Sequence, residues 1–409
     1  MTTLRIPFLI AICLIFVTFP QAKAQENIAL SHPGSLTLFR PFTNNDDEGV
    51  FTNLPLRLSV LASVGYDDNV FTTHDHTKGS GFDELSLGIG SHIGNQRTRF
   101  DADLSLGMIY YWSRPGNKID PDISLNLSFT HEFNPRLVLG ITSFMAYQQQ
   151  PDFSLGIGQL NNVGNYFTTI DSITLGYQWT RRFSTVTSYT LSTYTYSESA
   201  VADQENRFEH LFGQQFRYQL YPTVTVVLEY RFGYIQYETA NTNSYSQYAL
   251  GGADFTLSPK LTFTFRAGAE FRHFLGDFSG DATYPYFEST LAYEYLPRSF
   301  IRWYNRYGLE QSDFGIASQS KQTYRTGLQI SHSFGSKLKA ELGIYYSNDQ
   351  YDAPISNTDN AVDVNASVSY AVTRKFSVQA GYTYTRVFSQ IVTQDYARNR
   401  VYLGASYAF

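Results

Sequence analysis

Charged residues of both signs recur within the apolar segments of this chain, at the positions between the apolar ones. Glu229 and Arg231, for example, flank Tyr230. Because residues two apart lie on the same face of an extended strand, these charges share the face opposite the apolar side chains. The residues assigned to this polar face are Glu229, Arg231, Arg266, Glu270, Arg272, Glu288, Glu294, Arg302, Arg306, Arg325, Lys339 and Glu341, together with the aromatic Tyr304. Guanidinium and carboxylate groups on one face can bind and orient polar solutes.

Two arrangements of these charges are compatible with the pattern. Counting from the adjacent turns places five of them at a similar height along their strands: Glu229, Arg266, Glu288, Arg306 and Arg325. A ring of both signs at one height would form a constriction whose transverse field orients polar solutes. Ladders of arginine and carboxylate across neighbouring strands would instead stiffen a wall without selecting anything. Tyr304 adds a ring on which a sugar could lie.

Residues for catalysis or metal binding form no recognisable motif. None of the eight histidines is accompanied by a nucleophile motif, so we predict no catalytic residue and no enzyme. His74-Asp75-His76 could bind a divalent metal, and Asp67-Asp68-Asn69 and Asn357-Thr358-Asp359-Asn360 could hold calcium. Solvated loops and turns explain the three motifs more simply. We therefore predict no metal and no cofactor.

The segments that position the charged residues alternate with the period of two typical of β-strands. From Leu56 onward, runs of about ten residues place apolar and polar side chains on opposite faces. Ten residues is the length that a tilted strand needs to cross a bilayer. Counting such runs predicts about eighteen strands, or sixteen if the weakly alternating segments around Phe183 and Phe208 are left out. A soluble all-β propeller or jelly roll would need shorter strands.

The composition favours the same fold. Tyr and Phe number 32 each, aromatic residues make up 16% and charged residues only 16%, whereas soluble domains usually carry about 25% charged residues. Most of the aromatics, including Tyr177, Trp179, Tyr230, Tyr382 and Tyr407, fall on the apolar face, where interfacial girdles lie. Tyr293 and Tyr295 belong to the same group. The net charge of -6 argues against a nucleic-acid partner.

The connectors alternate between tight turns and longer polar loops. Asn134-Pro135-Arg136 and Gly335-Ser336-Lys337 are tight, whereas Asp67 to Ser80, Gln148 to Asn165 and Ser197 to Glu205 are long. Gly276 to Asp281 and Asn348 to Asn360 are further loops of this kind. This asymmetry is expected of membrane β-barrels with short periplasmic turns and long extracellular loops.

The N-terminal region has the features of an export signal. Arg5 precedes an apolar run from Ile6 to Phe19, and Ala22-Lys23-Ala24 supplies a signal-peptidase pattern, so we predict a signal peptide at 1–24. The single cysteine, Cys13, lies within it. Residues 25–53 contain prolines and an acidic cluster and show no period. We interpret them as a periplasmic extension, either a mobile leader or a plug or contact.

The last ten residues, Arg400 to Phe409, resemble the C-terminal strand that the insertion machinery of bacterial outer-membrane β-barrels recognises. Tyr407 and Phe409 fall on its apolar face and are the expected assembly signal. In such barrels this strand pairs with the first one, because hydrocarbon cannot satisfy an open sheet edge. We therefore expect an all-β, antiparallel up-and-down transmembrane β-barrel over residues 54–409.

The first strand and its exit, Leu58 to Phe71, contain Gly65-Tyr66-Asp67-Asp68-Asn69-Val70. This element resembles the Gly-Tyr-Asp-Asp-Asn-aliphatic opening of the Putative beta-barrel porin 2 family. Members of that family are often linked to exopolysaccharide gene clusters, so the resemblance implies a role in the passage or assembly of surface polysaccharide. The family offers no catalytic residues to carry over.

The sequence thus predicts a β-barrel in the outer membrane of a Gram-negative-type bacterium. Its leading hypothesis is a channel for polar solutes or exported polysaccharide, lined by Glu229, Arg231, Arg266, Glu270, Glu288, Arg302, Tyr304, Arg306 and Arg325. The alternative is a non-conducting barrel that anchors a periplasmic or surface complex, and an outer-membrane enzyme is more remote. The expected partners are outer-membrane lipid, the barrel-insertion machinery and a polysaccharide or small polar solute.

Overall fold

The computed structural model describes residues 56–149, 164–276, 280–311, 320–351, 357–392 and 394–409. The predicted signal peptide (1–24) and the predicted extension (25–53) lie outside the described residues. Where the chain is described, no helix is long and apolar enough to cross a membrane.

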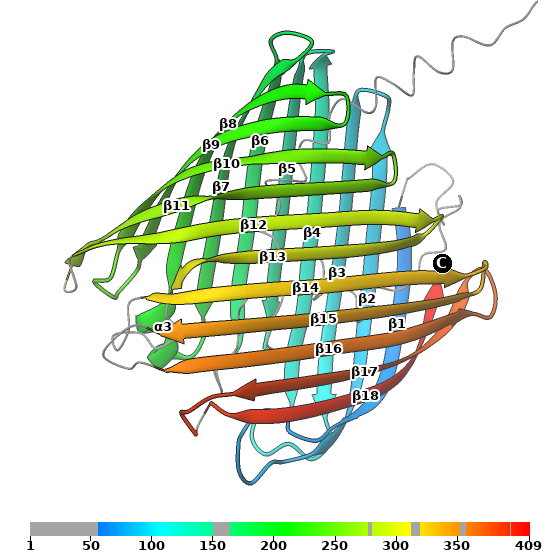
Figure 1. Ribbon diagram of the computed structural model, residues 1–409. Coiled ribbons are helices and arrows are strands. Elements are labelled where there is room, and N and C mark those ends of the chain that lie inside the picture. Colours follow the sequence, from blue (N-terminus) through cyan, green and yellow to red (C-terminus); the bar gives the residue numbers. More distant parts are fainter. Residues whose placement is uncertain (1–55, 150–163, 277–279, 312–319, 352–356, 393) are drawn as a thin grey trace, which may run out of the picture.

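Eighteen antiparallel strands form one sheet (Figure 1). Their bounds are β1 Leu56–Asp67, β2 Ser80–Gly94, β3 Thr98–Tyr111, β4 Ile119–Asn134, β5 Leu137–Gln148, β6 Tyr166–Gln178, β7 Phe183–Tyr196, β8 Arg207–Tyr221, β9 Val224–Tyr237, β10 Ser244–Ser258, β11 Leu261–Phe274, β12 Gly280–Leu296, β13 Ser299–Gln311, β14 Ser320–Phe334, β15 Leu338–Tyr351, β16 Thr358–Ala371, β17 Phe376–Phe388 and β18 Tyr396–Ala408. The weakly alternating segments around Phe183 and Phe208 are strands β7 and β8, so the prediction of eighteen strands is confirmed and sixteen is wrong.

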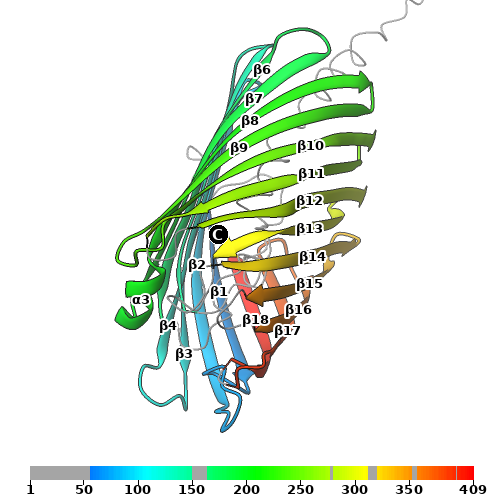
Figure 2. The same cartoon turned by 60° about the vertical axis from the view of Figure 1, so that its left-hand side comes forward.

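The sheet closes into a barrel because β18 pairs with β1. In this pairing Tyr407 lies opposite Val60, and the Phe409 N–H donates to the Leu58 carbonyl at 2.9 Å. Every strand therefore has a neighbour on each side, as a barrel in hydrocarbon requires. In Figure 1, β10 to β18 form the near wall and β1 to β7 lie behind it, and Figure 2 shows the same walls from the side.

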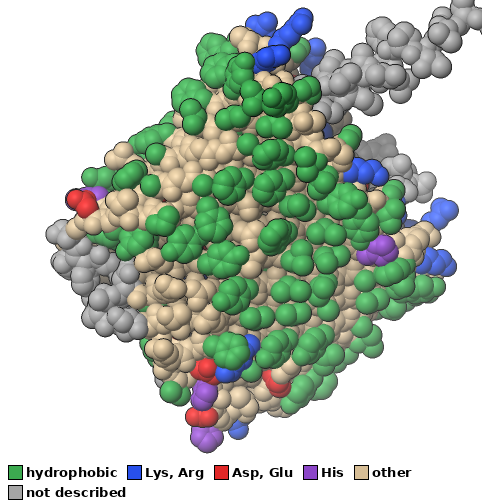
Figure 3. Space-filling model, in the orientation of Figure 1, with side chains coloured by type: hydrophobic (Ala, Val, Ile, Leu, Met, Phe, Trp, Pro, Cys, Tyr) green, Lys and Arg blue, Asp and Glu red, His purple; other side chains and the backbone are tan. Residues whose placement is uncertain are grey.

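The two faces of the wall differ as the alternation predicts. Leu228 and Leu403 point outward and are more than 60% exposed, whereas Glu229 on the inner face is buried. Figure 3 shows hydrophobic side chains spread over the outer surface of the near wall, with the charged side chains gathered at its ends. The predicted outward positions of Trp179, Tyr230 and Tyr407 are confirmed by their exposure.

The two ends of the barrel differ in their connectors. At the turn end, where the even-numbered strands end, polar side chains hold the tight turns. In one of them the Asn134 Oδ1 accepts from the N–H groups of Arg136 and Leu137 at 2.9 and 3.1 Å. At the opposite loop end the connectors are longer. One of them, expected as a polar loop, contains the short helix α3 (Ser199–Glu205), in keeping with the helix propensity of its Ala, Gln and Glu residues.

Candidate functional site in the barrel lumen

Six buried charges of alternating sign cross the inner face of β8 to β12. We call Arg217, Glu229, Arg231, Asp254, Arg266 and Glu288 the lumen charge network. Each of them is less than a tenth exposed. Charges removed from water in this way are stable only when they are paired.

The pairing within the network is continuous. Arg231 contacts Glu229 at 2.6 Å and Glu288 at 2.7 Å, and Arg266 contacts Asp254 at 2.7 Å and Glu229 at 3.3 Å. Arg217 pairs with Asp254 from the other side. Three arginines thus meet three carboxylates. The network carries no net charge and fixes five strands to one another.

A second group of charges lies closer to the loop end. Glu310 accepts from Arg325 at 2.6 Å and from Arg306 at 3.2 Å. Arg272 pairs with Glu270 at 2.8 Å, and its guanidinium also donates to the backbone carbonyl of Leu309 at 3.4 Å. These contacts tie β11 to β13 across the intervening β12.

The pairing of these charges matches the second predicted arrangement, in which arginine and carboxylate ladders across the strands stiffen the wall. Glu229, Arg231, Arg266, Glu270, Glu288, Arg306 and Arg325 all face the lumen as predicted, and each is engaged by a neighbouring charge. On β5, β6 and β7 the described lumen-facing positions carry no charged residue; they hold mainly Ser, Thr, Gly and apolar side chains. The paired charges described above therefore lie on β8 to β14, and β5 to β7 carry none of them.

Arg302 and Tyr304 stand apart from the paired charges. The Arg302 guanidinium lies over the ring of Phe300, 4.8 Å from its centroid, and its side chain is exposed. The ring of Tyr304 lies across Gly327 on β14, where a Cβ would meet it at 2.2 Å. A glycine at this place lets the tyrosine lie against the wall. Both residues are available to a solute in the lumen.

These two residues belong to a more accessible region at the turn end. We call the partly or fully exposed inner side chains of Thr264, Thr290, Glu294, Arg302, Tyr304, Lys339 and Glu341 the vestibule. On β3, Arg99, Asp101 and Asp103 also face the lumen and are not buried. Sequence reasoning did not select these three, although the alternation of β3 would have placed them inside.

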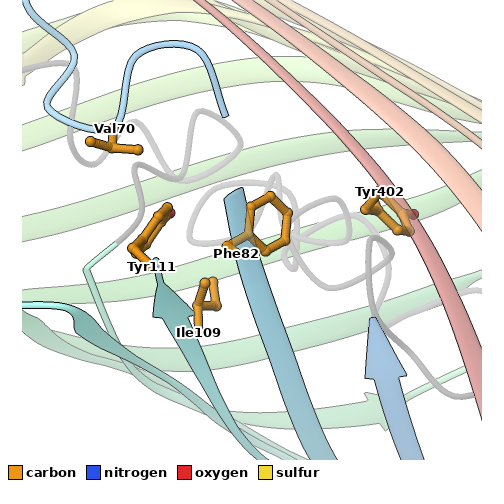
Figure 4. Close-up of a cluster of buried hydrophobic side chains, with 5 residues drawn as sticks. All are labelled: Val70, Phe82, Ile109, Tyr111 and Tyr402. Atoms are coloured by element: carbon orange, nitrogen blue, oxygen red, sulfur yellow. The ribbon is translucent and has the colours of Figure 1, made fainter. Parts of the chain in front are cut away.

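The loop end of the barrel is more filled. Val70 follows β1 and packs with Phe82, Ile109, Tyr111 and Tyr402, all less than a tenth exposed. Figure 4 shows these side chains converging from the first loop, β2, β3 and β18. The barrel therefore offers its accessible polar lining on the turn side.

The Asp67-Asp68-Asn69 motif joins the first and last strands. Asp67 is fully buried and accepts two hydrogen bonds from the Arg398 Nε at 3.0 and 3.1 Å, while Asp68 accepts from the N–H of Asn399 at 2.7 Å. Asn69 donates to the carbonyls of Thr73 and Ala397. The calcium alternative is not needed to explain this motif, because its carboxylates already have protein partners. We call these contacts the seam latch.

The His74-Asp75-His76 motif in the first loop contacts a carboxylate on another loop. His74 Nδ1 lies 2.8 Å from the Asp395 carboxylate, on the loop before β18. Within the described ranges, no group of three or more His, Cys, Asp or Glu side chains could hold a metal ion. The second candidate calcium motif, at Asn357 to Asn360, contains a hydrogen bond from Asn357 Nδ2 to Asp359 Oδ1 at 2.7 Å.

Comparison with known proteins identifies the chain at the level of a family. The family model described as Putative beta-barrel porin 2 matches residues 49–409. No curated protein matches the chain.

Several solved porins are similar to the chain. The chain is similar to OccAB4 from Acinetobacter baumannii (14% identity, 87% of this chain and 98% of that chain, TM-score 0.42). It is also similar to OpdK from Pseudomonas aeruginosa, solved with vanillate (9%, 87% and 99%, 0.43), and to a BenF-like porin from Pseudomonas fluorescens Pf-5 (9%, 88% and 100%, 0.45).

Proposed function

The chain belongs to the Putative beta-barrel porin 2 family, and we propose that it is an outer-membrane channel for polar solutes. The main observation in support of this proposal is the accessible vestibule inside a closed barrel whose outer surface is apolar. A wall of this kind separates lipid from a water-filled interior. Eighteen strands enclose a lumen wide enough for an aqueous path unless chain segments fill it.

The solute class follows from the vestibule. Its accessible groups include hydroxyls, the paired Lys339 and Glu341 and the aromatic Tyr304. Such a lining suits hydrophilic, hydroxyl-rich solutes, and an exported polysaccharide is one member of that class. The turn end then faces the periplasm, so a solute leaving the cell meets the vestibule first. We assign the protein no enzymatic activity.

The assembly of the channel is part of the same proposal. The outward Tyr407 and Phe409 are the residues through which the barrel-insertion machinery would recognise the chain. Outer-membrane lipid would contact the apolar surface seen in Figure 3. The proposal places the chain, after removal of residues 1–24, in the outer membrane of a Gram-negative-type bacterium.

A non-conducting barrel that anchors a complex is the second candidate. It is favoured by the lumen charge network, whose charges are buried and paired, and by the apolar cluster around Val70 at the loop end. Side chains that satisfy one another stiffen a wall and have no need of a solute.

Liposome swelling distinguishes the two candidates. Proteoliposomes containing the mature chain are diluted into isotonic solutions of arabinose, sucrose, raffinose and stachyose. A channel predicts swelling whose rate falls with the size of the sugar, because larger solutes pass a fixed lumen more slowly. No swelling beyond that of empty liposomes, for protein shown to be folded by its heat-dependent gel mobility, would favour the anchoring barrel.

A further inference from the structure

We propose that the inner wall of β13 to β16 carries a binding subsite for an uncharged sugar ring, at the turn end of the lumen. The inference rests on the proposed channel function and adds to it a place and a ligand chemistry. Its residues come from four neighbouring strands. Tyr304 and Glu341 among them were predicted from the sequence to face the lumen, whereas Gly343, Gln329, Ser331 and Asn365 were not.

The centre of the subsite is a recess at Gly343. Gly343 on β15 lies opposite Gln329 on β14 and Asn365 on β16, so a position without a side chain separates two amides. The recess measures about 30 Å³, enough for one or two groups of the size of a water molecule. It would hold a hydroxyl or hydroxymethyl substituent, while the ring to which that group belongs would lie in the open lumen.

Aromatic rings flank the recess. Tyr345 lies beside Gly343, where a Cβ would meet its ring at 3.2 Å, and Tyr304 lies across Gly327 in the next row. The two ring centroids are 6.5 Å apart. Phe300 lines the recess on the other side. Tyrosine and phenylalanine rings lying against a wall offer flat apolar surfaces, and the C–H faces of a pyranose ring pack on such surfaces.

Polar atoms without a protein partner point to a hydroxylated ligand. Ser331, which is 1% exposed, and Asn365 both line the recess, and neither the Ser331 Oγ nor the Asn365 Oδ1 has a hydrogen-bond partner. A buried polar atom left unpaired costs about 1–3 kcal/mol. A ligand hydroxyl satisfies either atom, because it can both donate and accept.

The charges around the recess favour a neutral ligand. Glu341 lines it, but its carboxylate is paired with Lys339 at 2.7 Å. Arg302 lies over the ring of Phe300. Since the one acidic group that lines the recess is paired, and Arg302 does not line it, selection would come from ring stacking and hydroxyl contacts rather than from net charge.

Saturation-transfer NMR on the detergent-solubilised full chain tests the subsite without requiring conduction. The probes are maltoheptaose and cellohexaose, with hexagalacturonate as the acidic counterpart. We expect transfer to the ring protons of at least one neutral probe. Binding should weaken about tenfold, or about 1.4 kcal/mol, in Tyr304→Ala and in Gly343→Val, which fills the recess.

Matched variants control for folding. Tyr307→Ala removes a tyrosine from the outer face of the same strand, and Gly140→Val adds the same side chain to a lumen glycine of β5 with open space around it. Both should bind like the unaltered chain. Absence of transfer from either neutral probe, equal binding by all variants, or preference for hexagalacturonate would overturn the subsite. In each of those cases the proteoliposome swelling experiment would still test conduction independently, so failure of the subsite and failure of the channel are distinguishable.

Discussion

The single residue Arg231 joins two strands of the barrel wall through ion pairs. Its guanidinium is 1% exposed and bridges Glu229 on its own strand and Glu288 on β12. Removing one partner of a buried pair leaves the other charge without compensation, which costs more than the pair contributes.

We therefore predict that Arg231→Met destabilises the barrel by about 3–5 kcal/mol, even though the replacement is of similar length. Urea titration of the protein in lipid vesicles, followed by tryptophan fluorescence, measures the free energy of unfolding. Arg302→Met is the control, because Arg302 is exposed in the lumen and its replacement should cost about 1 kcal/mol or less. Equal effects of the two substitutions would show that the buried ion pairs of Arg231 do not stabilise the barrel.

The sequence predicts which side of the wall a residue faces better than it predicts which residue it contacts. Alternation places Glu229, Arg231 and Arg266 inside the barrel, and the structure confirms that orientation. The contact between Arg231 and Glu288 joins strands that are not neighbours in the sheet, so it depends on wall curvature that no local pattern encodes. The recess at Gly343 also escapes prediction, because it depends on the register of three neighbouring strands.

The seam between β1 and β18 is the element on which closure depends. Its ladder joins residues more than 300 positions apart, and the seam latch adds buried contacts at the loop end. The Gly-Tyr-Asp-Asp-Asn element thus has a structural explanation: Asp67 binds Arg398, Asp68 binds Asn399, and Asn69 shapes the turn that follows.

We predict that Asp67→Asn weakens closure, because Arg398 loses its carboxylate partner and stays buried. The temperature at which the compact gel band converts to the unfolded band should fall by several degrees. Asp75→Asn, an exposed position in the same loop, should leave that temperature unchanged. An unaltered transition in Asp67→Asn would mean that the latch does not contribute to closure.

The alternation within a single strand supplies a second test. Leu106 on β3 points outward and is 41% exposed, whereas Ser105 faces the lumen. Arginine at Leu106 should cost about 2–4 kcal/mol, because it places a charge in hydrocarbon near mid-height. Arginine at Ser105 should cost less than half of that. Urea titration in vesicles compares the two, and equal costs would contradict the assigned faces.

At the scale of the whole molecule, the sequence predicts the fold closely. Period-two runs, tight turns such as Asn134-Pro135-Arg136 and the terminal strand lead to a closed barrel, since each of these signals is local. The sequence does not predict the uneven filling of the lumen. The loop end is packed by the cluster around Val70 and the turn end is accessible, a difference that arises only when loops and distant strands come together.

Single-channel conductance in planar lipid bilayers shows whether the barrel is an open channel. We predict discrete, steady openings by the mature chain. We also predict opposite shifts of the reversal potential in a salt gradient for two vestibule variants: Arg302→Gln toward cations and Glu294→Gln toward anions, because each removes an accessible lumen charge. Folded protein that inserts without openings would contradict the channel and favour the anchoring barrel.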